Sequence, residues 1–165
     1  MKKIIFTSLA ILLVSFIFVS NTSAANLSDK QKNIIIDSCN TTQTTLQRIG
    51  DSDITARINR GRNYDQILKL FYAMNTRVAS NNIAEPRLAE LTKDFENNLN
   101  NFRNDYNKYN EQLKLTYETN CKTKVDAFYD NLNNSRNSRA KIRSDINELN
   151  KIIKQYQKVV KGLVK

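Results

Sequence analysis

Three arginines lie close together in the segment ARINRGRNYD, which spans residues 56–65. They are Arg57, Arg60 and Arg62, with Gly61 between the last two. A guanidinium keeps its positive charge at all ordinary pH values and presents a planar fork of N–H donors, so clustered arginines suit the binding of carboxylates and phosphates. The segment therefore indicates either a binding site for an anion or a polar interruption in a helical core.

Cys39 and Cys121 are the second group of residues whose type could do chemistry. Their separation matches no zinc-binding spacing, and the chain contains no histidine, which is the commonest metal ligand and the usual general base. Two cysteines permit one disulfide in an exported protein; the alternative is a pair of buried thiols. Which of the two applies depends on the compartment.

The N-terminus has the three parts of a signal peptide. A basic start, MKK, precedes the apolar run IIFTSLAILLVSFIFVS, and the small residues Ser23 and Ala25 then offer a cleavage site. We predict a signal peptide over residues 1–25 and export to the periplasm, the cell surface or the medium. The alternative is an uncleaved membrane anchor at the N-terminus, because the apolar run is slightly long for a signal peptide. Export favours the disulfide.

The chain is basic, with 26 Lys and Arg against 16 Asp and Glu and a net charge of +10. Residues 1–25 contain two lysines and no acid, so their removal lowers the net charge to +8. A basic exported protein is drawn to anionic polymers of the envelope and to anionic membrane surfaces, although the same charge also keeps a long molecule in solution. No motif indicates specific recognition of nucleic acid.

The elements that position these residues must be long helices, because the chain has only 3 Gly and 1 Pro. With a mean hydropathy of −0.56, the chain is too apolar to be disordered and too polar to form a thick core. We predict an all-α fold, an elongated three-helix antiparallel bundle or coiled coil over residues 26–165. Its arms lie at about residues 28–80, 86–120 and 124–164.

Each arm carries apolar residues at alternating steps of three and four, as an amphipathic helix does. In the first arm, Ser28 and Gln31 form a capping-box pattern, and Gly50 before a run of acids predicts a kink or a short loop. The third arm has a heptad seam in which only Ser135 and Arg139 are polar. We find no strand pattern.

The helix rise of about 1.5 Å per residue fixes which residues of antiparallel arms lie level with one another. A turn at residues 80–85 places Cys39 within roughly 7 Å of the level of Cys121. We therefore predict up-down-up topology, resembling a spectrin-type repeat in shape only, with a disulfide at the end opposite that turn. The bond would close a loop of about 82 residues and stabilise the fold by roughly 4 kcal/mol.

The same register brings the arginine segment together with polar residues of the other two arms. Arg57 to Arg62 lie level with about residues 103–108, where Asp105 stands, and Asp105 lies level with about residue 138. The residues predicted to meet there are Arg57, Arg60, Arg62, Asp105, Ser135 and Arg139.

Two interpretations of this meeting point remain open. In the first it is a polar layer that fixes the register of the arms: Asp105 pairs with an arginine, and Gly61 lets the helices approach closely. In the second it is an anion site, because one carboxylate cannot neutralise four arginines. Both interpretations require that the residues lie close together in space.

Several stretches of the chain are similar to those of a group of exported two-cysteine helical proteins of small-genome bacteria. They are RGRNYDQILKLF, MNTR, the aromatic heptads at mid-chain and CKTKVDAFYDNL with its arginine-rich continuation. The resemblance implies the two-cysteine helical plan; the group carries no known activity, so it implies no chemistry. The outline also resembles the tentacled periplasmic holdase chaperones, but those contain a small β-body for which this sequence shows no strands.

Motifs of catalysis are missing from the sequence: there is no phosphate-binding glycine loop, no nucleophile elbow and no Cys-His pair. The acids Asp94, Glu96, Asp145 and Glu148 stand at spacings typical of solvated helical ion pairs. We therefore predict that the protein is not an enzyme and holds no cofactor or metal.

The function predicted from these features is that of a non-enzymatic scaffold or binding module of the cell envelope. The alternatives are a holdase-type chaperone for exported chains and a binder of anionic envelope polymers or of a membrane surface. The C-terminal stretch KIIKQYQKVVKGLVK is basic and amphipathic and could lie on a membrane. Its apolar residues continue the helix seam in register, which favours packing in the core. Partners would be proteins, envelope polyanions or further copies of the chain.

Overall fold

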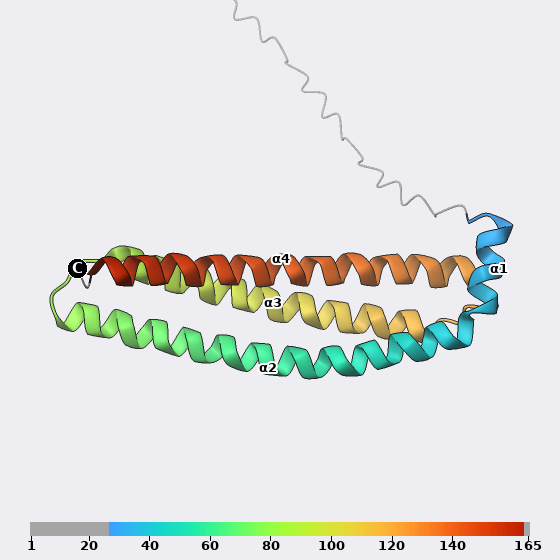
Figure 1. The fold of residues 1–165 in the computed structure, drawn as a ribbon, viewed down its shortest axis with the longest axis horizontal. Helices are drawn as coiled ribbons and strands as arrows, with labels where there is room; N and C mark the ends of the chain where they lie inside the picture. The colour runs from blue at the N-terminus through green and yellow to red at the C-terminus, as the bar shows by residue number, and fades with distance from the viewer. Residues whose placement is uncertain (1–26, 164–165) are drawn as a thin grey trace, which may run out of the picture.

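The computed structural model describes residues 27–163, which form four helices. They are α1 (Asp29–Asp37), α2 (Cys39–Ser80), α3 (Pro86–Glu118) and α4 (Val125–Leu163). The three long helices run side by side with α3 in the middle, and α1 crosses one end of them (Figure 1). The prediction of an all-α fold is confirmed, but four helices stand where three arms were expected. The predicted signal peptide lies outside the described residues.

The break in the first arm lies at Ser38, and α2 continues through Gly50, so a short loop at Gly50 is wrong. Ser38 ends α1, and its hydroxyl donates to the carbonyl of Ile34 at 2.7 Å. Gly50 is buried within α2, and a Cβ placed there would lie 3.5 Å from Leu113 of α3. Packing against α3 therefore stabilises the helix where glycine alone would weaken it. α2 bows smoothly instead of breaking (Figure 1).

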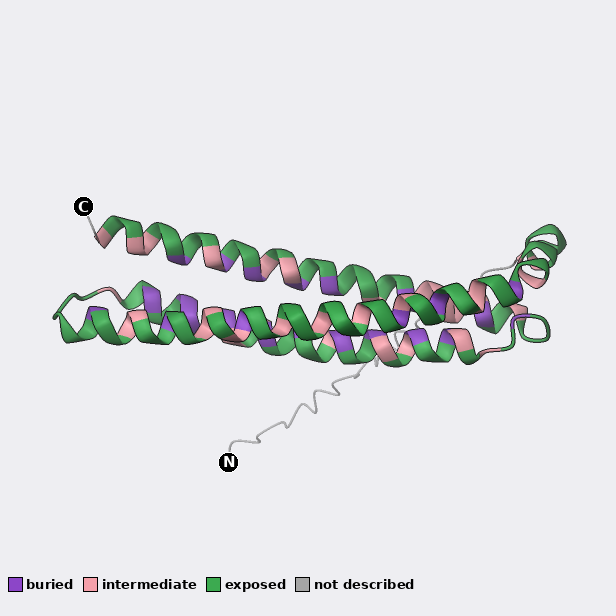
Figure 2. Ribbon diagram, turned by 60° about the horizontal axis from the view of Figure 1, so that its bottom comes forward, coloured by how far each residue is buried: buried purple, intermediate pink, exposed green. Residues whose placement is uncertain are grey.

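Helix α3 carries the centre of the core because it packs against both α2 and α4. Its Phe95, Leu99 and Phe102 are fully buried, and the buried residues of all three long helices lie along their inward faces (Figure 2). Within the described chain, no Cα atom of α2 comes within 8 Å of one in α4. These two helices meet through long side chains only; the ring of Phe71, for example, stacks on Tyr156 at 3.6 Å.

The disulfide joins Cys39, the first residue of α2, to Cys121 in the loop between α3 and α4. The two Cα atoms lie 5.6 Å apart, within the usual range for a disulfide. The side-chain amide of Gln43 donates to the carbonyls of Tyr117 and Thr119, at 2.8 and 3.0 Å, and so satisfies the end of α3. This end of the molecule is therefore fixed by a covalent bond and by hydrogen bonds.

The ends of the helices concern two further expectations: the capping box at Ser28 and the packing of the C-terminal stretch. Ser28 and Gln31 form the capping box that begins α1, as predicted. Near the end of α4, Val159, Val160 and Leu163 are partly buried against the core. None of the helices within residues 27–163 combines the length and the apolar character needed to cross a membrane.

Candidate functional site

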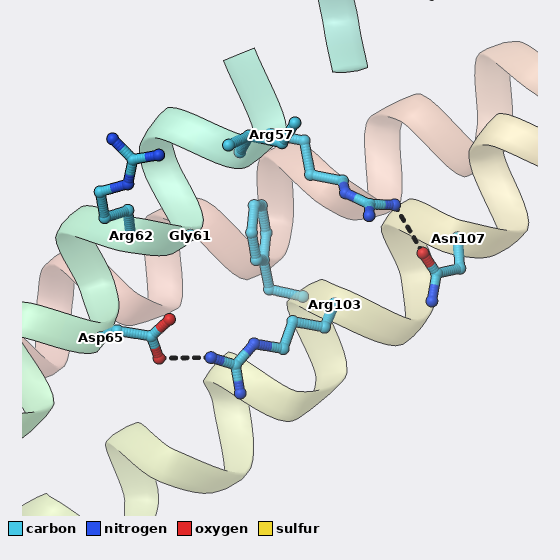
Figure 3. Close-up of a pocket in the computed structure, with 8 residues that line it drawn as sticks. Arg57, Gly61, Arg62, Asp65, Arg103 and Asn107 are labelled. Carbon is cyan, nitrogen blue, oxygen red and sulfur yellow. Dashed lines mark hydrogen bonds and ion pairs between the residues drawn. The ribbon is translucent and has the colours of Figure 1, made fainter. Parts of the chain in front are cut away.

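Arg57 and Arg62 line a hollow of about 470 Å³ between α2 and α3, which we term the α2–α3 hollow (Figure 3). Its lining residues are Arg57, Ile58, Gly61, Arg62 and Asp65 of α2 and Phe102, Arg103 and Asn107 of α3. Arg57 reaches across to α3 and donates to the amide oxygen of Asn107 at 2.6 Å. Arg103 reaches back to α2 and forms an ion pair with Asp65.

A second hollow, of about 400 Å³, opens between α2 and α4 and has α3 as its floor. We term it the α2–α4 groove. It is lined by Asp53, Ala56 and Arg60 of α2, by Tyr106 and Tyr109 of α3, and by Arg139, Ile142, Arg143 and Ile146 of α4. Tyr106, Tyr109 and Ile142 are buried, whereas the three arginines are exposed. The groove therefore offers a solvent-accessible rim of positive charge over a floor that is already packed.

Asp53 is the central polar residue of the α2–α4 groove. Its carboxylate accepts a hydrogen bond from the Tyr109 hydroxyl at 2.6 Å and pairs with Arg139 Nη2 at 3.2 Å. Its backbone carbonyl accepts the hydroxyl of Tyr106. The Asp53 side chain is only 18% exposed, and its carboxylate is held by one guanidinium from α4 and one hydroxyl from α3.

The two tyrosines stay neutral in this surrounding. Burial, and then the negative charge of Asp53, raise the pKa of Tyr106 to about 12. Burial and the hydrogen bond and charge of Asp53 also raise the pKa of Tyr109 well above its ordinary value. Both hydroxyls therefore act as hydrogen-bond donors at any physiological pH.

Asp105 has lysine partners, so the prediction that it pairs with an arginine is wrong. Lys141 Nζ lies 3.0 Å from Asp105 and 2.7 Å from Asp145, and Lys108 lies 3.5 Å from Asp105. Residues 139 and 141 point in directions about 200° apart on a helix. Arg139 therefore faces α2, while Lys141 turns to the other side of α3.

Asp145 is buried, not solvated as its spacing suggested. Its side chain is 7% exposed and one oxygen, Oδ2, has no hydrogen-bond partner within the described chain. The hydrogen bonds to Asp145 and Asp105 raise the pKa of Lys141. Burial acts against the charge of Asp105, but Lys141, together with Asp145 and Lys108, outweighs it, so the pKa of that carboxyl lies below its ordinary value. These charges form a closed cluster between α3 and α4.

Two more predicted features of the polar layer differ from expectation. Ser135 is buried and shares a hydrogen bond of 2.8 Å with the uncharged side chain of Thr116 on α3. A Cβ placed at Gly61 would have nothing within 4 Å, so this glycine lines a hollow and does not bring two helices together. The candidate residues are thus divided over the two sides of α2 and the α3–α4 interface.

Each of the two hollows beside α2 carries three arginines and one aspartate. We term the six arginines the arginine belt; they are Arg57, Arg60, Arg62, Arg103, Arg139 and Arg143. Six positive and two negative charges leave an excess of +4 at one level of the bundle. Four of these arginines have no ion-pair partner within residues 27–163: Arg57, Arg60, Arg62 and Arg143.

Sequence reasoning missed Asp53, Arg103 and Arg143, and it assigned Tyr106 and Tyr109 only to the core. The signal for Asp53 was its helical spacing, because Asp53, Arg57 and Arg60 follow one another at steps of four and three. The acids that follow Gly50 also fit a helix break, and this second interpretation masks the helical spacing.

The chain was compared with models of protein families, with curated proteins and with solved structures. No family model, no curated protein and no solved structure matches it. The resemblance to exported two-cysteine helical proteins therefore stays a prediction.

Proposed function

We propose that the protein is a non-enzymatic binding module of the cell envelope, which presents the arginine belt to an anionic partner. In this proposal α2, α3 and α4 act as one antiparallel bundle that serves as a stiff scaffold, with the disulfide fixing one end. The observation that carries it is the charge excess of the belt: three arginines face a single aspartate in each hollow beside α2.

A structural role alone does not account for that excess. Charges that merely fix the register of helices are balanced, as those around Lys141 are, because like charges at one level repel each other. In the belt, Arg57 is held by Asn107 at 2.6 Å and by the ring of Tyr106, whose centroid lies 5.7 Å from its guanidinium carbon. A guanidinium that is held in place but not neutralised is suited to receive an anion with little further ordering.

Export is part of the proposal and rests on the predicted signal peptide together with the disulfide, since disulfides persist in oxidising compartments. The holdase alternative has less support. Exposed large apolar residues are spread over α1, α2, the α2–α3 loop and α3, instead of gathering in one cradle: Ile34, Ile54, Ile58, Leu70, Tyr72, Ile83 and Leu115.

Polyanion binding at increasing salt tests the proposed function. The oxidised protein would be titrated with fluorescent dextran sulfate and with polyglutamate, and we expect affinity to fall steeply as salt rises. Replacing the four arginines without an ion-pair partner by glutamine should weaken binding at least tenfold. They are Arg57, Arg60, Arg62 and Arg143.

The matched control removes the same charge from the end of α4, through glutamine at Lys151, Lys154, Lys158 and Lys161. We expect this control to lose less than threefold. An equal loss in both variants would mean that total charge, not the belt, attracts the polyanion. No binding of the wild-type protein at low salt would overturn the proposal.

A further inference from the structure

The α2–α4 groove already shows how it holds an anionic group, because Asp53 occupies it from within the chain. Its carboxylate receives a hydroxyl from the floor and a guanidinium from the facing helix, Tyr109 at 2.6 Å and Arg139 at 3.2 Å. Only one nitrogen of Arg139 makes this contact, and its side chain is 51% exposed. The guanidinium therefore keeps donors that can face a ligand.

Two further arginines line the same groove without a carboxylate of their own. Arg143 follows Arg139 by one helical turn on α4, and Arg60 stands on α2. Since all three guanidiniums border one hollow of about 400 Å³, a small anion in it would meet donors from both helices. Three positive charges less that of Asp53 leave +2 in the groove.

The charge of +2 and the presence of Asp53 select the kind of anion. A single carboxylate would have to compete with Asp53, which is tethered in place and therefore present at high effective concentration. A phosphate monoester carries about −1.5 to −2 near neutral pH and offers three acceptor oxygens, so it can neutralise the groove and engage several guanidiniums at once.

The floor of the α2–α4 groove is unsuited to an apolar ligand. Tyr106, Tyr109 and Ile142 are already buried, at 7, 3 and 5% exposure, so an acyl chain or an apolar helix face would bury little new surface there. The exposed groups on the rim are guanidiniums. The ligand is therefore recognised by its charged head.

The geometry points to a binding site for a phosphate monoester group formed by Arg60, Arg139 and Arg143, with Asp53 as an internal competitor that tunes its affinity. This inference rests on the proposed function and names the anion for one side of the belt. The phosphate can belong to a soluble molecule or to a lipid headgroup, because the chemistry that the groove recognises is the same.

Asp53→Asn is the most informative variant. Asparagine keeps an oxygen that accepts the Tyr109 hydroxyl but removes the charge that competes with phosphate. We expect about a tenfold gain in affinity for inorganic phosphate, measured by calorimetric titration at constant ionic strength. A residue with a merely structural role would leave the affinity unchanged or lower it, so no gain overturns the role of Asp53.

The double variant Arg60→Gln/Arg143→Gln should lose at least tenfold in affinity for phosphate. Its matched control is Lys154→Gln/Lys158→Gln, which removes the same charge near the end of α4, away from the groove, and should change the affinity less than twofold. Thermal melting by circular dichroism shows that each variant is folded. Equal losses in both double variants, or tighter binding of acetate than of phosphate, would overturn the site.

Two arms of the experiment distinguish the sources of the phosphate. Glucose 6-phosphate represents soluble esters, and vesicles with and without phosphatidic acid represent lipids. If dextran sulfate binds with salt dependence but phosphate does not bind to the wild-type protein, the inference fails while the proposed function stands. If neither binds, both fail.

Discussion

Two groups of charges lie at the same level of the bundle on different sides of α3, and they differ in balance and burial. Between α3 and α4, Lys141 links Asp105 and Asp145, with Lys108 at the margin, so two positive charges meet two negative ones. Beside α2, six arginines meet two aspartates.

In the proposed function, the difference separates charge that holds the fold from charge that is offered to a partner. The Lys141 cluster contains a carboxylate that is almost fully buried, which is stable only because its counter-ion is fixed beside it. The arginine belt is half exposed where its ion pairs are formed, at 51% for Arg139 and 44% for Arg103. Solvent therefore screens much of its excess charge, and in the proposed function a ligand replaces that water.

Reduction of the disulfide should have the largest effect on the free energy of unfolding, and it should affect both groups of charges alike. The bond closes a loop of 82 residues, so its loss should lower the free energy of unfolding by about 4 kcal/mol. Urea unfolding with and without reductant measures the change. The variant Cys39→Ala/Cys121→Ala serves as the control, because reductant should not affect it. A much smaller change would mean that the cross-link adds little to a bundle already fixed by Gln43 and the packing of α3.

Lys141→Met should have the next largest effect, because it leaves Asp145 buried without its counter-ion. We expect a loss of about 2 kcal/mol in the free energy of unfolding at neutral pH. The matched control is Lys151→Met, whose partner Glu148 is 44% exposed and whose loss should cost less than about 0.5 kcal/mol. Equal effects would contradict the contrast between a balanced buried cluster and a solvated one.

Lys141→Met also tests how the stability of the fold depends on pH. Because the folded pKa of Asp105 lies below its ordinary value, the charge of that group stabilises the folded state at pH values above the unfolded pKa, about 4. This contribution is lost as pH falls through the folded pKa. Stability of the wild-type protein should therefore drop more steeply below about pH 4 than that of Lys141→Met.

Ionisation of the two tyrosines in the α2–α4 groove should have a smaller effect on stability. The raised pKa of Tyr106, about 12, and the raised pKa of Tyr109 mean that their neutral forms stabilise the folded state. That stability is complete below the ordinary tyrosine pKa of about 10 and is lost as pH rises through the folded values. Asp53→Asn should lower both pKa values, yet leave them raised because burial is the larger cause.

Ultraviolet titration of tyrosinate in the wild-type protein and in Asp53→Asn measures this shift. Tyr109→Phe identifies which transition belongs to Tyr109. Unchanged titration in Asp53→Asn would show that burial alone sets the two pKa values, and it would weaken the assignment of Asp53 to the centre of the groove.

The sequence predicted the parts of the fold that follow from periodicity. Heptad seams gave the long helices, and the antiparallel register placed Arg57 level with residues 103–108; in the structure its partner is Asn107. The position of the break was not predictable from local residues, because the packing of Gly50 on Leu113 outweighs its low helix propensity. For the site, the sequence predicted only which residues lie at the same height along the bundle, and not which side chains meet there. Whether Arg139 or Lys141 meets Asp105 depends on how α4 is rotated about its own axis. The spacing of residues along the sequence does not determine that rotation.

Gly61→Ala should have the smallest effect, and its sign tests the polar layer directly. A Cβ at this position has nothing within 4 Å, so alanine adds no clash and gains about 0.5–1 kcal/mol of helix propensity over glycine. In a chain of this size the melting temperature should rise by roughly 2 °C. The variant should also leave phosphate binding unchanged, because Gly61 lines the α2–α3 hollow and not the α2–α4 groove. A loss of stability would mean that α2 approaches another helix closely at Gly61, as a register-fixing layer requires, and the division between a structural cluster and a binding belt would then have to be redrawn.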